Sequence, residues 1–449
     1  MFETIKNWWK GVRNKMFPLN TLEDAIDGEL AISQAMLNRV SLWRDMVGGH
    51  APWIKEDIHS MRLERAVCRE FANVALNEME SSVTNASLDE IYRQAIRNLN
   101  ENLQDGLGLG SFCIKPMGID GVEYVTADQF VPQRFDSSGR LTKVSFIETK
   151  MIKKDSYYYR IECHDLTNNG LTISNRAYHS NTEGSFGKRV DLADVPEWAK
   201  LPEFIRYPMM DRPDFGYYRN PIKNDIDGSF CGVSVFDSAF DLLRKADTQF
   251  SRLDWEYESG ERAVHVDSAA FIHTEHGDKL PERSKRLYRG LNISMGNDKE
   301  LFDVFSPEFR DQSIINGLEE YKRDIEFNVS LAYGDLSKNQ EVEKTATEVR
   351  VSKQRKYNMV KAIQKNLSDC LDDLVYALAF YNGMTQSGYK FKCDFSDSIL
   401  TDADEERKSD RVDLSIGAMT LLDYRMKWYK ETKAEALKHI VQEAPDLQE

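Results

Sequence analysis

Two glycine-rich stretches are the first candidates for chemistry, because glycine loops can cradle phosphate groups. Residues 184–189 come closest to the GxxxxGK(S/T) loop of nucleotide-binding proteins, but their spacing differs. Arg189 also stands where a magnesium-binding Ser or Thr is required. Residues 106–111 precede a strand pattern, whereas a dinucleotide-binding motif follows a strand and opens a helix. We interpret both stretches as turns and expect no cofactor.

Metal binding and acid catalysis have weaker candidates. His273 and His276 form an HxxH pattern near His265, but no long helix is predicted to hold them, so an exposed loop is favoured. The acidic run at 402–406 could suggest a nuclease, yet five consecutive residues point in different directions on a helix. The six cysteines lie at least 23 positions apart, which excludes CxxC motifs and predicts free, buried thiols. We therefore expect no catalytic residue and no metal site.

The composition indicates a large folded protein with an acidic balance. The chain has 449 residues, 41% of them hydrophobic, which argues against global disorder. Its 59 basic and 74 acidic residues give a net charge of −15, the wrong sign for tight binding of duplex DNA. No apolar run resembles a signal peptide or a membrane span, so we expect a cytoplasmic protein without a membrane partner. Residues 1–20 are expected to form an arm that packs on a partner.

The predicted elements form an α+β arrangement. Apolar residues at helical spacing predict helices within 21–105. Alternation and turn signals over 110–180 predict an antiparallel meander. Residues 191–232, rich in proline and glycine, are predicted to form an extended connector, and short amphipathic helices are expected after residue 394.

Three long helices lie between the connector and the C-terminal helices. The first has an apolar seam that begins at Phe236, with Ser234 and Asp237 as a capping box. The second is expected to begin at 306–308, after a small mixed α/β tip at 260–305.

The third long helix follows a polar loop. Thr345 and Glu348 form a T-x-x-E capping box, and the seam continues for roughly 55 Å, so a kink is expected. The stretch from Lys344 to Lys365 contains seven basic residues and one acidic residue, Glu348. This stretch could face DNA or a neighbouring subunit, and the acidic balance of the chain favours the subunit.

Several short sequences match a known family. They are SPE at 306–308, NGL at 316–318, IEFN at 325–328, LAYG at 331–334, KTATE at 344–348, GAM at 417–419 and YRMK at 424–427. With these motifs in this order, the chain resembles the portal protein, or head–tail connector, of tailed bacteriophages, in the branch typical of siphophages of Gram-positive hosts. The resemblance covers nearly the whole chain and is strongest from about residue 306 to 430.

The resemblance implies a helix-rich α+β subunit of portal type. Such a subunit has an α/β wing, two long stem helices, a small α/β clip, a very long kinked wing helix and a C-terminal helical crown. The implied boundaries are an arm at 1–20, a wing at 21–232, stem helices at 233–259 and 306–332, a clip at 260–305, a tunnel loop at 333–344, the long wing helix at 345–383 and a crown at 384–449.

The resemblance also implies a function without catalysis. Twelve copies would form a ring at one capsid vertex, through which double-stranded DNA is packaged and ejected, in virions assembled in the host bacterial cytoplasm. The implied partners are the terminase large subunit, the major capsid and scaffolding proteins, and a head-completion adaptor that leads to the tail. The alternatives are a DNA-processing enzyme, such as a nuclease or ATPase, and another head-completion protein.

The implied site is the tunnel loop, with Lys338 and Lys344 as its only cations. We expect transient DNA contact and a loop that moves without unravelling either helix, because tight phosphate binding around a ring would stop sliding. The loop residues are Asp335, Ser337, Lys338, Asn339, Gln340, Glu341, Glu343 and Lys344. Thr345 and Glu348 would start the next helix, and the expected contacts with DNA or a subunit are Arg350, Lys353, Arg355 and Lys356.

Overall fold

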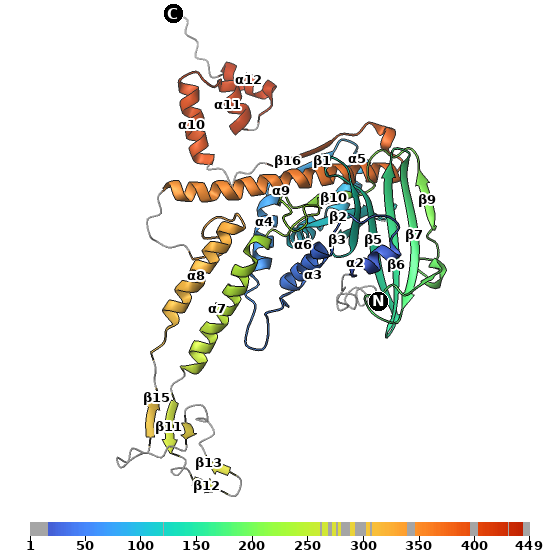
Figure 1. The fold of residues 1–449 in the computed structure, drawn as a ribbon. Coiled ribbons are helices and arrows are strands. Elements are labelled where there is room, and N and C mark those ends of the chain that lie inside the picture. The colour runs from blue at the N-terminus through green and yellow to red at the C-terminus, as the bar shows by residue number, and fades with distance from the viewer. Residues whose placement is uncertain are drawn as a thin grey trace, which may run out of the picture.

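The chain forms a body, a protruding helical stem with a small tip, and a group of C-terminal helices (Figure 1). Helices predominate and the strands are largely antiparallel, so the fold is α+β, as predicted. The computed structural model describes residues 17–119, 121–260, 263–267, 272–274, 277–279, 288–291, 302–305, 308–338, 346–395, 403–429 and 431–442.

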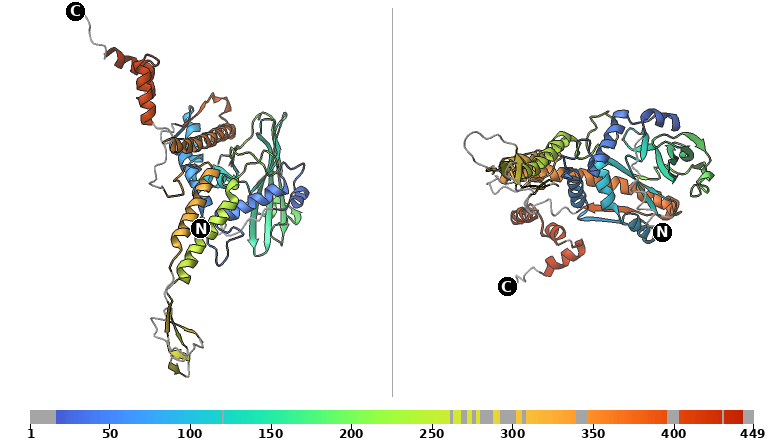
Figure 2. Two further views of the ribbon diagram at one scale, coloured as in Figure 1. Left: turned by 60° about the vertical axis from the view of Figure 1, so that its left-hand side comes forward. Right: turned by 90° about the horizontal axis from the view of Figure 1, so that it is seen from below.

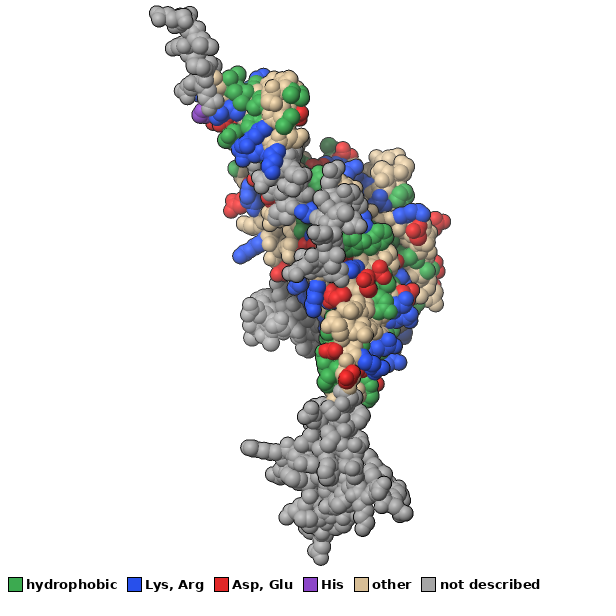
Figure 3. Space-filling model, turned by 90° about the vertical axis from the view of Figure 1, so that its left-hand side faces the viewer, with side chains coloured by type: hydrophobic (Ala, Val, Ile, Leu, Met, Phe, Trp, Pro, Cys, Tyr) green, Lys and Arg blue, Asp and Glu red, His purple; other side chains and the backbone are tan. Residues whose placement is uncertain are grey.

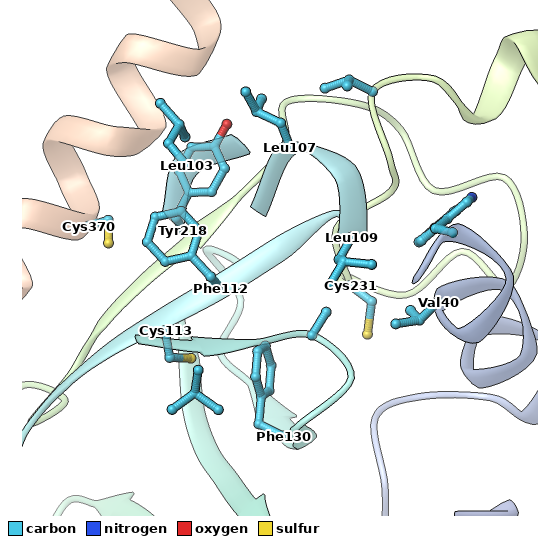
Figure 4. Packing of buried hydrophobic residues seen from close by; sticks show 14 of the residues in the cluster. Val40, Leu103, Leu107, Leu109, Phe112, Cys113, Phe130, Tyr218, Cys231 and Cys370 are labelled. Atoms are coloured by element: carbon cyan, nitrogen blue, oxygen red, sulfur yellow. The ribbon is translucent and has the colours of Figure 1, made fainter. Parts of the chain in front are cut away.

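Five helices open the body and share one apolar core. They are α2 (Leu19–Ala25), α3 (Gln34–Gly48), α4 (Leu63–Leu76), α5 (Ala86–Ala95) and α6 (Leu99–Leu109). Figure 4 shows Leu103 and Leu107 of α6 near Phe112 and Tyr218 in this core. The helices predicted within 21–105 are confirmed, but residues 79–83 of that stretch form a strand.

Two antiparallel sheets complete most of the body. The large sheet has the order β4-β5-β6-β7-β8, with β9 also paired to β7, and the small sheet has the order β10-β2-β3. The strands are β2 (Ser111–Pro116), β3 (Val122–Thr126), β4 (Phe130–Phe135), β5 (Leu141–Lys153), β6 (Ser156–Thr167), β7 (Gly170–Ser180), β8 (Lys188–Val190), β9 (Phe204–Tyr207) and β10 (Gly216–Arg219).

The predicted meander is confirmed for β5, β6 and β7, which pair in sequence order. The predicted meander does not extend to β2 and β3, which pair with each other and form a separate sheet in which β2 also pairs with β10. Residues 191–232 are also more than a connector. They contain the turn η1 (Leu192–Asp194) and supply β9 and β10, whose backbone groups find partners on β7 and β2.

Helix α9 (Ala346–Tyr381) crosses the body as one uninterrupted helix of 36 residues (Figure 1). The long helix predicted at 345–383 is therefore confirmed, but the expected kink is not seen. The turn η5 (Thr385–Ser387) and strand β16 (Phe391–Phe395) follow, and β16 pairs with β1 (Met79–Val83). Residues 391–395 thus belong to the body, although the sequence placed them in the crown, because β16 satisfies the backbone groups of β1.

The stem is the antiparallel pair α7 (Phe240–Ser259) and α8 (Asp311–Asn328), which Figure 2 shows leading from the body to the tip. The described strands of the tip are β11 (Ala263–Asp267), β12 (Ile272–Thr274), β13 (Gly277–Lys279), β14 (Tyr288–Leu291) and β15 (Phe302–Phe305). The C-terminal helices are α10 (Ala403–Ser415), α11 (Leu421–Trp428) and α12 (Lys433–Gln442), which confirms the short helices predicted there.

Both stem helices begin later than predicted. The turn η2 (Asp237–Ala239) precedes α7, and the Asp237 carboxylate accepts hydrogen bonds from Arg39 and Trp43 instead of forming a capping box. Helix α8 begins at Asp311 because the Arg310 N–H and guanidinium group both donate to Glu256 of α7.

A buried charge network joins the large sheet to α9. The His164 ring lies between two carboxylates, with Nε2 2.8 Å from Glu162 Oε1 and Nδ1 2.8 Å from Asp214 Oδ1. The Tyr381 hydroxyl of α9 donates to Asp214 Oδ2 at 2.7 Å. Burial by itself lowers the pKa of His164, but the Asp214 and Glu162 carboxylates outweigh it and raise this pKa to about 9.

Candidate functional site at the base of the 333–344 loop

The loop predicted to face DNA leaves α8 through a tight turn. Ser330 has a φ of 67°, in the left-handed region, and the Leu331 N–H donates to the Glu326 C=O at 2.8 Å. Gly334 then has a φ of 100°, which favours glycine because it has no Cβ. These residues reverse the direction of the chain.

Glu326 of α8 holds the first part of this loop. Its side chain is fully buried, and Oε1 accepts the backbone N–H groups of Gly334, Leu336 and Ser337 at 3.1, 2.6 and 2.7 Å. The Ser337 hydroxyl donates to Oε2 at 2.9 Å. One buried carboxylate therefore accepts hydrogen bonds from four donors of the loop. These hydrogen bonds offset the free-energy cost of burying the carboxylate.

The chain continues back along α8 after Ser337. The Lys338 N–H donates at 2.7 Å to Oε2 of Glu319, about two turns before Glu326 on the same helix. The expectation of a freely moving loop is therefore wrong for residues 334–338, because they are bonded to α8.

Asp335 connects the loop to two helices of the body. Lys356 Nζ of α9 lies 3.0 Å from Asp335 Oδ2 and 2.6 Å from Glu70 Oε1 of α4. Burial raises the pKa of Asp335, although Lys356 opposes this shift. Lys356 is only 8% exposed, so its ammonium group is not available for the predicted contact with DNA or a subunit.

Arg355 lies next to this ion pair and stacks on two rings. Its guanidinium carbon is 4.5 Å from the centroid of Phe327 and 5.2 Å from that of Tyr333. Within the part of the chain that the structure describes, the Arg355 Nε and Nη2 atoms have no hydrogen-bond acceptor. Its contact with DNA or a subunit stays a prediction, as does that of the exposed Lys353.

The structure separates the other predicted site residues into three groups. Asp335 and Ser337 point into contacts within the chain, while Lys338 is exposed. Glu348 and Arg350 lie in α9, but their side chains are outside the described residues. The predicted residues that lie wholly outside the described ranges are Asn339, Gln340, Glu341, Glu343, Lys344 and Thr345.

Three acidic residues of the site were missed from the sequence: Glu319, Glu326 and Glu70. Glu326 carried a signal, since it is an acidic residue beside Ile325, which shares the helical spacing of the apolar residues Ile314 and Leu318. Glu70 carried none, because it lies 286 positions before its partner Lys356.

The arrangement can position a loop, and its charged groups are largely paired. In the described ranges, no group of three or more His, Cys, Asp or Glu side chains could hold a metal ion. None of the helices described is long and apolar enough to cross a membrane. Figure 3 views the molecule from the α8 side and shows acidic, basic and hydrophobic side chains mixed along the stem.

No protein-family model matches the chain, and no curated protein shows significant similarity to it.

Proposed function

We propose that the chain is a structural subunit of a viral portal, a ring-shaped channel for double-stranded DNA at one capsid vertex. The observation that carries this proposal is a loop between a protruding helical stem and an uninterrupted helix of 36 residues. We call the contacts that hold its residues 334–338, made by Glu326 and by the Asp335–Lys356 ion pair, the clamp. In this proposal the body is the wing, the tip is the clip and the C-terminal helices are the crown.

The clamp supports this function for a mechanical reason. Glu326 ties the loop to the stem, and the Asp335–Lys356–Glu70 ion pairs tie it to α9 and α4. A force that DNA exerts on residues 339–344 would therefore reach the stem and the body together. The proposed partners are further copies of this chain, the terminase large subunit at the tip, the major capsid and scaffolding proteins, and a head-completion adaptor.

Electron microscopy of the purified protein tests the proposal. End-on images should show rings with a central channel, and native mass measurement should give an oligomer of about twelve copies. A monomer by both methods would refute it. Nuclease or ATPase activity of the protein alone would favour the enzyme alternative.

A further inference from the structure

A tryptophan stands exposed on one flank of the stem. Trp255 of α7 is 66% exposed. Two residues later, the Tyr257 hydroxyl lies 3.4 Å from Asp311 Oδ2 of α8. Since successive residues of a helix are about 100° apart, Trp255 lies almost opposite Tyr257 and points away from α8.

A hollow lies along the α8 flank of the stem. The hollow has a volume of about 480 Å³. Its lining combines one apolar side chain with polar and charged ones: Gln312, Ile315, Asn316, Gly317, Glu319, Glu320, Arg323 and Lys338. Asn316 lies nine residues before Ile325, which is fully buried in the stem. Nine residues are about two and a half helical turns, so Asn316 and Ile325 point in opposite directions. The hollow therefore faces away from α7.

The tryptophan and the hollow lie at similar heights along the stem. The contact between Tyr257 and Asp311 joins the lower ends of the helices, and Gln249 Nε2 donates to the Ile314 C=O at 3.3 Å above it. Trp255 lies between these two contacts, level with the lower end of the hollow. A second copy placed alongside in the same orientation would bring its tryptophan to this hollow, whereas an inverted copy would not.

The lining of the hollow suits an indole ring. Ile315 offers an apolar surface, and the Glu320 carboxylate can accept the indole N–H. Arg323 Nη1 donates to Glu320 Oε1 at 3.3 Å, and Arg323 Nε has no hydrogen-bond acceptor among the described residues. The guanidinium group can lie over an incoming ring. A buried tryptophan removes about 150–250 Å² from water, which is enough to anchor an interface.

We propose that Trp255 of one subunit inserts into the α8 hollow of the next subunit, an inference that rests on the proposed function. The tryptophan and the hollow are different surfaces on opposite flanks, so the contact is head-to-tail. Head-to-tail contacts close into rings when the rotation between subunits allows it. The inference names the pair of surfaces that would hold the proposed assembly together along the stem.

Cross-linking between two single-cysteine variants tests the pairing. Arg252→Cys, which lies exposed one turn before Trp255 and keeps the tryptophan, and Asn316→Cys protein, mixed before assembly and treated with a short bis-maleimide, should give a cross-linked dimer that neither variant gives alone. Wild-type protein controls for the native cysteines, of which Cys163 and Cys393 are half-buried and the others are buried. Dimers of the Arg252→Cys variant alone would indicate a symmetric contact and overturn the proposal.

Association measurements give a second, independent test. Trp255→Ala should weaken self-association at least about thirtyfold, the effect of removing an interface anchor. Phe204→Ala is the matched control, because Phe204 is similarly exposed on β9 of the body, and it should leave association unchanged. Wild-type rings that neither cross-link between these positions nor respond to Trp255→Ala would overturn this inference and leave the proposed function standing. Wild-type protein that forms no oligomer would overturn both.

Discussion

Replacing Glu326 with Gln should loosen the base of the loop with little change in volume. The buried carboxylate accepts three backbone N–H groups and the Ser337 hydroxyl. A hydrogen bond to a charged group contributes about 1.5–3 kcal/mol and a neutral one about 0.5–1.5 kcal/mol, so each N–H bond weakens by about 1 kcal/mol. The lower cost of burying a neutral amide offsets part of this loss. We expect the free energy of opening the loop to fall by about 2 kcal/mol.

Hydrogen–deuterium exchange of the peptide that covers residues 330–338 measures this change. The amides of Leu336 and Ser337 should exchange about thirtyfold faster in the Glu326→Gln variant, since about 1.4 kcal/mol corresponds to a factor of ten. Asp324→Asn, on the exposed side of the same helix, is the matched control and should leave their exchange unchanged. Unchanged protection in Glu326→Gln, or equal acceleration in both variants, would refute the assignment of Glu326 as the anchor.

Three further predictions concern the stability of the body. Lys356→Met leaves two carboxylates without their cation and should lower the free energy of unfolding in urea by about 2–4 kcal/mol; a change near zero would contradict the ion pairs. Because the folded-state pKa of His164 is raised from 6.5 to about 9, its stabilising effect is complete below pH 6.5 and is lost as the pH rises through 9. The urea midpoint should therefore fall over this window, and less so in His164→Gln; equal slopes would contradict a charged His164. Gly110→Ala should lower the melting temperature more than Gly118→Ala. Both positions have positive φ, but an added Cβ at Gly110 would meet a backbone oxygen at 2.2 Å, whereas one at Gly118 would meet nothing within 4 Å. Equal melting temperatures would show that the backbone yields at Gly110.

The α+β class and the three long helices could be predicted because each depends on a local pattern. Apolar residues at spacings of three and four indicated α7, α8 and α9. The predicted helix starts failed where a distant residue intervened. Glu256 takes the donors of Arg310 before α8, and Asp237 is occupied by Arg39 and Trp43 before α7.

The loop shows the same division between local and distant information. The sequence by itself determined that a polar segment separates two long helices, because the residues that end one helix and begin the next lie within that segment. Only the tertiary structure decided that residues 334–338 of this polar loop are held in place by side chains of helices. Their partners are Glu319 and Glu326 of α8 and Lys356 of α9, and Lys356 in turn pairs with Glu70 of α4. A charge pair between elements depends on distances in space that no local pattern encodes.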